Sequence, residues 1–185
     1  GILWFGVDDA ATSCLTPIYS SGLRAPKCFE VGNGHLTQYS PTSAFWLFNR
    51  VAQFAYLRSN LVAPEIQKAA ADHELGAMQI IPTVDAEALR LYKTKPGEVK
   101  EYLTVWSEKF ADRMFKKWKE LDEYLLIKFI DGNVKAQNQD GSFKDNGAGR
   151  NIPAKPIQPG YSEHWKPTVA EAAGARLKVV PPETK

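Results

Sequence analysis

Cysteine is scarce in this chain, since only Cys14 and Cys28 occur among its 185 residues. No C-x-x-C pair is present, which excludes a thioredoxin-like redox motif and a zinc ribbon. The two cysteines would form one disulfide if their segments lay side by side. Two buried free thiols are the alternative, because an unpaired cysteine behaves as a small apolar side chain.

Histidine is nearly as scarce, with His35, His73 and His164 as its three representatives. No two of them lie at metal-ligand spacing, and His73-Glu74 lacks the second histidine of an H-E-x-x-H helix. The G-x-S-x-G turn that presents a serine nucleophile is also missing. We therefore expect no metal site, and we expect each histidine to be a surface or core residue rather than a catalyst.

A strong charge of either sign is missing as well, because the formal net charge is +2. The basic cluster Lys116, Lys117 and Lys119 lies among acidic residues, which favours a solvated helix face over a phosphate-binding patch. No apolar run is long enough to cross a bilayer. We expect neither a nucleic-acid partner nor a membrane span, and an apolar content of 44% is typical of a globular core.

The first 36 residues are rich in strand and turn signals. Residues 2–7 form an apolar run of aromatic and branched side chains, which predicts a buried strand with neighbours on both sides. Residues 16–19 predict a second strand and residues 29–31 a short third one, ended by the turn Gly32-Asn33-Gly34. Because few other strands are available to flank the first, we expect the chain to be part of a larger protein.

Residues 40–131 are predicted to be helical. Ser40 is suited to cap the first helix, with Pro41 at its first position. Pro64 predicts the start of the next helix, and Gly76 and Pro82 predict that this helix is kinked or in two parts. The longest helix is expected from Pro96 to Asp131.

Apolar residues three or four positions apart mark the buried face of two of these helices. In the first helix they are Phe45, Phe48, Val51, Ala52, Ala55 and Tyr56, and in the longest helix they are Val99, Tyr102, Trp106, Phe110, Met114, Trp118, Leu121 and Leu125. Gly132 is expected to end the longest helix in a left-handed conformation.

The C-terminal region is predicted to be a long loop followed by a short helix. The loop covers residues 134–161, and a loop of this length is usually functional or wraps over a partner. A short helix is expected at residues 163–173, stopped by Gly174, with a closing strand at residues 177–180. Together these patterns predict an α+β chain, residues 1–185, forming one domain or part of one, with a strand-rich start and a mainly helical body.

Two carboxylates follow the first predicted strand directly. Asp8 and Asp9 would lie at a strand end, where binding sites gather in open sheets. Adjacent strand residues point to opposite faces, so one of the pair at most would face a given pocket. The alternative is structural, with an aspartate side chain bonded to neighbouring main chain in a turn.

Several segments carry a resemblance to a known family. The chain resembles, in order and over nearly its whole length, the later part of bacterial C69-type cysteine dipeptidases. The most specific segments are Gly6-Val7-Asp8-Asp9-Ala10 and Ser43-Ala44-Phe45-Trp46. The other matching segments are Trp4-Phe5, Thr16-Pro17-Ile18-Tyr19, Pro26-Lys27-Cys28-Phe29, Gly32-Asn33-Gly34, Phe48-Asn49, Tyr124-Leu125-Leu126, Asp131-Gly132-Asn133-Val134, Pro159-Gly160-Tyr161 and Trp165.

This resemblance implies an N-terminal-nucleophile hydrolase with an αββα sandwich, of which the chain would be the C-terminal portion. In such enzymes the first residue of the mature chain is a cysteine. Its thiolate attacks the peptide carbonyl, and its own α-amino group acts as general base. A thioester forms and water hydrolyses it. The resemblance implies dipeptides as substrates and neither a metal nor an organic cofactor.

The chain departs from the family at the nucleophile. Its first residue is Gly1, and neither Cys14 nor Cys28 has a free α-amino group. We therefore expect the catalytic cysteine in an upstream N-terminal portion, no catalytic residue in this chain, and no activity of the chain alone. The more distant choloylglycine-type hydrolases carry an arginine near a helix start resembling residues 39–45. Ala44 stands near that position here, so that role is not carried over.

What remains is a supporting role for this chain. Asp8, Asp9 and Ser13 are the predicted substrate-binding residues, with a carboxylate holding the free ammonium group of a dipeptide. A sheet cut short leaves edges and apolar faces bare, so we expect a homo-oligomer. The resemblance is to bacterial proteins, and both a cytoplasmic and a secreted or periplasmic location remain open.

Two other functions compete with the dipeptidase. One is a non-catalytic helical interaction module derived from the same family. The other, which has less support, is an independent enzyme that uses Cys14 or Cys28.

Overall fold

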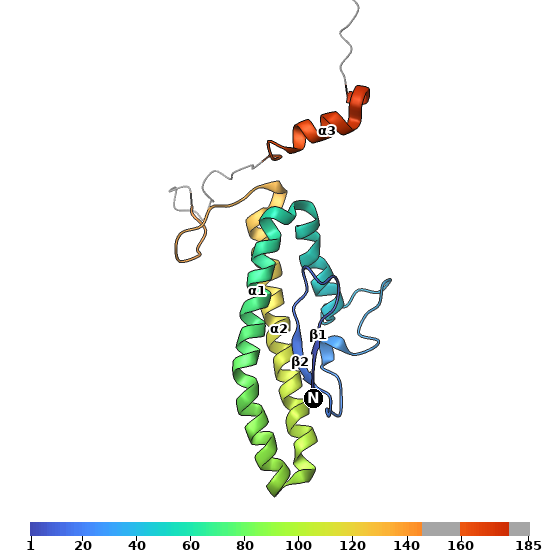
Figure 1. Cartoon of the computed structure of the whole chain (residues 1–185), viewed down its shortest axis with the longest axis vertical. Helices are drawn as coiled ribbons and strands as arrows, with labels where there is room; N and C mark the ends of the chain where they lie inside the picture. The colour runs from blue at the N-terminus through green and yellow to red at the C-terminus, as the bar shows by residue number, and fades with distance from the viewer. Residues whose placement is uncertain (146–159, 178–185) are drawn as a thin grey trace, which may run out of the picture. The chain divides into compact units, whose positions relative to one another are not determined.

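A computed structural model describes residues 1–145 and 160–177 (Figure 1). The chain is α+β, with a helical body and a two-stranded sheet. It divides into two compact units, Gly1–Phe129 and Ile130–Lys185. Within the described residues, no helix is both long and apolar enough to cross a membrane.

The sheet is an antiparallel hairpin of β1 (Ile2–Phe5) and β2 (Thr16–Tyr19). Both strands were predicted, although the first ends at Phe5 rather than at residue 7. The prediction that the first strand is buried with a neighbour on each side is wrong, because within the described residues β1 is a partly exposed strand that pairs with β2 alone. The third predicted strand, residues 29–31, is wrong. A short 3-10 helix, η1 (Lys27–Phe29), occupies its start, and the edge-to-face contact of Phe29 with Phe5, with ring centroids 4.9 Å apart, fixes it against the hairpin.

Helix α1 (Ala44–Thr94) begins later than Ser40 and Pro41 predict, because its N-cap is Ser43. The Ser40 hydroxyl is engaged elsewhere, since it donates a hydrogen bond of 2.6 Å to Oδ1 of Asn33. That contact belongs to the preceding loop, in which Asn33 also donates to the Lys27 carbonyl at 2.8 Å. Tertiary contacts of the loop therefore decide where the helix starts.

The break in α1 lies at Arg58, with φ −153° and ψ 68°, and not at the predicted interruptions. Gly76 and Pro82 both lie inside continuous helix, and Pro64 follows the break by six residues instead of opening a helix. Pro82 removes one main-chain donor. Packing outweighs that local loss, because this part of α1 buries His73, Ala77, Val84, Ala88 and Leu91.

The second long helix, α2 (Val99–Phe129), confirms the predicted apolar stripe. It was predicted to be the longest helix, which is wrong, because α1 continues through Pro64, Gly76 and Pro82. Helix α2 follows a 3-10 turn, η2 (Pro96–Glu98), and leads into η3 (Ile130–Gly132). Gly132 has φ 69°, as the predicted left-handed cap requires, and Asp131 also has positive φ. The buried members of the stripe are Phe110, Met114, Trp118, Leu121 and Leu125.

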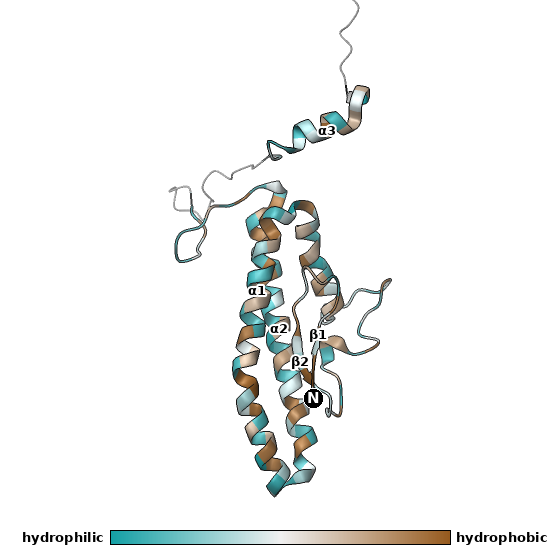
Figure 2. Ribbon diagram, in the orientation of Figure 1, coloured by the Kyte–Doolittle hydropathy of each residue, from teal (hydrophilic) through white to brown (hydrophobic). Residues whose placement is uncertain are grey.

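The core of the first unit lies between α1 and α2, with the hairpin against α2. Phe48 stacks on Trp118 at a centroid distance of 4.6 Å in the larger apolar cluster. The smaller cluster joins Tyr19 of β2 to Val84 of α1 and Phe110 of α2. Figure 2 shows that hydrophobic and hydrophilic residues alternate along both helices, as expected of amphipathic helices packed on one side.

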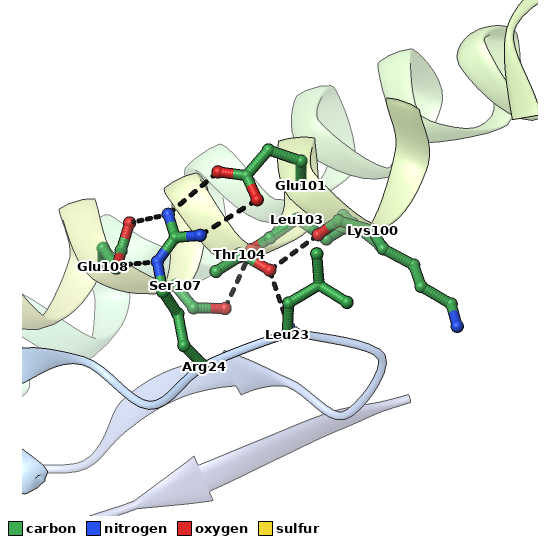
Figure 3. Close-up of polar contacts among 8 residues, drawn as sticks. All are labelled: Leu23, Arg24, Lys100, Glu101, Leu103, Thr104, Ser107 and Glu108. Atoms are coloured by element: carbon green, nitrogen blue, oxygen red, sulfur yellow. Dashed lines mark hydrogen bonds and ion pairs between the residues drawn. The ribbon is translucent and has the colours of Figure 1, made fainter. Parts of the chain in front are cut away.

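Polar contacts hold the hairpin and the segment after it on α2 (Figure 3). The Arg24 guanidinium binds the carboxylates of Glu101 and Glu108, at N–O distances of 2.6 to 2.9 Å. The Leu23 N–H donates to the Thr104 hydroxyl at 2.9 Å. In addition, the N–H of Tyr19 donates to the buried hydroxyl of Ser107 at 3.0 Å, so α2 also supplies a partner to β2.

The second unit contains a β-bridge between Gln137 and Phe143 and the helix α3 (Trp165–Ala173). This confirms the predicted short helix, and Gly174, with φ 55°, ends it as expected. Of the predicted strand 177–180, Leu177 belongs instead to the 3-10 turn η4 (Gly174–Leu177). Residues 178–180, and residues 146–159 of the predicted loop, lie outside the described residues.

Candidate functional site

The turn after β1 contains all three predicted site residues. Asp9 is its centre, because its Oδ1 accepts hydrogen bonds from the N–H groups of Ala11 at 2.8 Å and Thr12 at 3.0 Å. Its Oδ2 accepts from the Thr12 hydroxyl at 2.9 Å. This is the structural arrangement that the sequence offered as the alternative to substrate binding.

Tyr56, in the fourth turn of α1, reaches the same loop. Its hydroxyl donates to Oδ2 of Asp9 at 2.9 Å. Burial by itself opposes ionisation of Asp9, but the hydrogen bonds from Thr12, Tyr56 and the main chain hold the pKa of Asp9 below its ordinary value. Asp9 is therefore an ionised anchor of the turn.

Sequence reasoning missed Tyr56 as a site residue, because it placed Tyr56 in the buried apolar stripe of the first helix. The side chain is in fact exposed. A contact across 47 positions leaves no local signal in the sequence.

Asp8 differs from Asp9 in conformation and environment. Its φ of 72° lies in the left-handed region, which aspartate tolerates better than most residues. Burial, followed by repulsion from Asp9, raises the pKa of Asp8. The residue is nevertheless exposed, so its carboxylate has access to solvent and to a ligand.

Ser13 closes the turn and does not point a free hydroxyl at solvent. Its Oγ donates to the Val7 carbonyl at 2.6 Å. Gly6 permits this close packing, since a Cβ there would lie 2.8 Å from Ser13 Oγ and 3.0 Å from the Cys14 carbonyl oxygen. The Gly-Val-Asp-Asp segment is thus a compact turn with Asp8 on its outside.

A cavity of about 440 Å³ lies beside this turn. Its lining is mainly apolar and includes Val7, but Asp8, Asp9 and Ser13 do not line it. The remaining lining residues are Phe5, Cys28, Phe29, Glu30, Val31, Gly32, Asn33, Gly34, His35, Leu36, Ser43 and Phe45. Such a cavity is suited to an apolar group, with polar atoms at few positions.

Both cysteines are free, buried thiols, which answers the question that the sequence left open. Burial, reinforced by Glu74, raises the pKa of Cys14 to about 12. Burial and, less strongly, Asp112 do the same for Cys28. Thiols of this kind are poor nucleophiles, because the thiolate is the reactive form.

Across residues 1–145 and 160–177, no group of three His, Cys, Asp or Glu side chains is placed to hold a metal ion. His35 lines the apolar cavity, and His73 is buried with its Nε2 3.4 Å from the Thr16 hydroxyl. A second cavity, of about 240 Å³, is lined in part by the ion-paired side chains of Arg50 and Asp122.

No protein-family model, curated protein or solved structure matches the chain.

Proposed function

We propose that this chain is the supporting, C-terminal part of a cysteine dipeptidase of the N-terminal-nucleophile type. In this proposal a catalytic portion supplies the nucleophile cysteine and completes an αββα sandwich around the β1–β2 hairpin. The chain itself contributes the turn at Asp8 and Asp9 and the neighbouring apolar cavity. Its substrates are dipeptides.

One observation carries the proposal. Three separate segments that resemble the dipeptidases, residues 4–10, 26–34 and 43–49, each contribute side chains to the lining of the same cavity. Phe5 and Val7 come from the first segment, Cys28 and Phe29 from the second, and Ser43 and Phe45 from the third. Residues that resemble one family and converge on one cavity support a shared role there.

The properties of the two cysteines also support a nucleophile outside this chain. Neither Cys14 nor Cys28 has the exposed, low-pKa thiol that a nucleophile requires. This argues against an independent enzyme built on them and agrees with a nucleophile supplied from another segment.

Within the proposed site, Asp8 is the better candidate to hold the dipeptide ammonium group. Its carboxylate is on the exposed side of the turn, whereas both oxygens of Asp9 already accept hydrogen bonds from the protein. An ionised carboxylate and an ammonium group form a charge-assisted hydrogen bond, which is stronger than a neutral one.

The test compares the two aspartates in the complete enzyme that joins this chain to a cysteine-initiated catalytic portion. Asp8→Asn is expected to raise KM for dipeptides and leave the melting temperature unchanged. Asp9→Asn is expected to lower the melting temperature. An unchanged KM in Asp8→Asn would remove Asp8 from the site, and no hydrolysis of any dipeptide by the joined protein would contradict the proposed function.

A non-catalytic interaction module is the second candidate. The observation in its favour is a set of exposed apolar side chains on α1, namely Leu75, Met78, Leu89 and Tyr92. Dipeptide hydrolysis by the joined protein separates the two, since an interaction module has none.

A further inference from the structure

The two edges of the β1–β2 hairpin differ in their capacity to bind another strand. In an antiparallel pair, successive residues point their main-chain N–H and C=O groups alternately toward the partner strand and away from it. The Ser20 N–H donates to the Gly1 carbonyl, so Gly1 and Ser20 form a hydrogen-bonded pair. Because bonded and non-bonded pairs alternate, Leu3–Ile18 and Phe5–Thr16 are the next hydrogen-bonded pairs. Ile2 and Trp4 of β1 therefore point their main-chain groups away from β2.

The outer edge of β2 is closed. Its outward positions are Pro17, which has no N–H, and Tyr19, whose N–H donates to Ser107 of α2. Helix α2 lies along this side of the strand, and Figure 1 shows β2 between α2 and β1. A further strand has no place at this edge.

The outer edge of β1 is open. Within the part of the chain that the structure describes, the main-chain groups of Ile2 and Trp4 have no hydrogen-bond partner, and no strand other than β2 pairs with β1. The side chains of Ile2 and Trp4 pack on the smaller apolar cluster, so it is the main-chain edge that is left uncovered. Leu3, between them, is 55% exposed. A row of unpaired main-chain groups is a template for another strand.

We propose that a second copy of this chain adds its β1 to this edge as an antiparallel strand, with the two-fold axis at Leu3. Ile2 of each copy then pairs with Trp4 of the other, and both residues exchange main-chain hydrogen bonds. The two Leu3 side chains face each other directly across the axis. This edge is also the one that a catalytic portion would extend in the proposed dipeptidase, so the dimer is proposed for this chain on its own.

Two features favour a second copy as the occupant. The edge is self-complementary for two reasons. All four residues of β1 are apolar, and the outward N–H and C=O groups of Ile2 in one copy face those of Trp4 in the other. The closed edge of β2 also stops the assembly at two chains, so that a four-stranded sheet forms rather than a fibre. A strand from a different polypeptide would instead leave this chain monomeric on its own.

A cysteine at the two-fold axis tests this geometry. Residues facing each other in a non-bonded antiparallel pair have Cα atoms about 4.5 Å apart, which suits a disulfide. Under mild oxidation, Leu3→Cys is expected to give a covalent dimer as the major species. Leu23→Cys is the matched control, because Leu23 is also exposed, at 60%, but lies outside β1. The native cysteines are buried and do not compete.

Light scattering supplies a second measurement that needs no cross-link. The wild-type chain is expected to be a dimer across the micromolar range, and Leu3→Lys, which places two like charges face to face, is expected to weaken dimerisation at least about tenfold. Leu23→Lys should leave the dimer intact. Monomeric wild-type protein, or equal cross-linking of Leu3→Cys and Leu23→Cys, would overturn the proposal.

Discussion

The hydroxyl of Tyr56 lies 2.9 Å from Oδ2 of Asp9 and donates a hydrogen bond to it. This contact connects α1 to the turn that follows β1, across 47 positions of the sequence. It joins the helical body to the segment that carries the predicted site residues, so the position of Asp8 and Asp9 depends on α1 as well as on the hairpin.

Removal of this hydroxyl should change the ionisation of Asp9. In Tyr56→Phe the carboxylate loses one of the donors that favour its charged form, so the pKa of Asp9 should rise toward its ordinary value. A carboxyl NMR titration measures the change. Tyr92→Phe, near the other end of the same helix, is the control and should leave this pKa alone. An identical Asp9 titration in Tyr56→Phe and wild type would show that the contact is absent in solution.

Gly6 should tolerate no side chain. A Cβ at this position meets Ser13 Oγ at 2.8 Å and Leu15 Cδ2 at 3.0 Å, so Gly6→Ala should destabilise the chain by about 1–3 kcal/mol. Gly76→Ala is a contrasting control, because it lies in a helix interior with open space around it and should stabilise by about 0.5–1 kcal/mol. Urea unfolding measures both. Equal stability of the two variants would mean that the turn relaxes freely.

His73 should make stability fall with acid. It is 3% exposed, and burial, followed by Arg113 and Lys117, lowers its pKa from 6.5 to about 4. The unfolded chain therefore binds the proton more tightly. The stabilisation is fully present above pH 6.5 and is lost as the pH falls to 4, with a total on the order of 3 kcal/mol.

The pH dependence of unfolding free energy in His73→Gln tests this assignment. The slope between pH 6.5 and 4 should flatten in that variant, whatever its absolute stability, because Gln carries no proton in this range. A slope that persists unchanged in His73→Gln assigns the effect to other groups.

The Ser107 hydroxyl should contribute more to the free energy of unfolding than the ion pairs of Arg24 do. Ser107→Ala leaves the buried Tyr19 N–H without its acceptor and should cost about 1–3 kcal/mol. Arg24→Ala removes two ion pairs at the surface, where screening and side-chain entropy reduce their value. Thermal unfolding at low and high salt should show a small, salt-dependent loss for Arg24→Ala and a larger, salt-independent loss for Ser107→Ala. The reverse order would contradict this interpretation of the interface.

The native thiols should be protected in the folded chain. Cys14 and Cys28 are buried and have raised pKa values, so alkylation by iodoacetamide at neutral pH should be slow and should become fast in denaturant. Mass spectrometry follows both sites separately. Rapid alkylation of Cys28, which lines the apolar cavity, would show that the thiol is open to solvent.

The sequence predicted an element correctly where residues close together in the chain determine that element. The apolar spacing of Phe110, Met114 and Trp118 predicted the buried face of α2, and Gly132 predicted its end, because helical period and left-handed glycine act over a few residues. The start of α1 was predicted wrongly, since the signal at Ser40 was overridden by its hydrogen bond to Asn33.

By itself, the amino-acid sequence determined the buried face and the end of the helix after Pro96, the first two strands and the polar turn between them, because these features follow from side-chain period and turn chemistry. Only the tertiary structure decided that α1 breaks at Arg58 rather than at Gly76 or Pro82, that Tyr56 binds Asp9, and that both thiols are buried. It also decided which hairpin edge is open. The physical reason is that each of these outcomes depends on contacts between residues far apart in the chain, whose energies exceed the local preferences of any single residue.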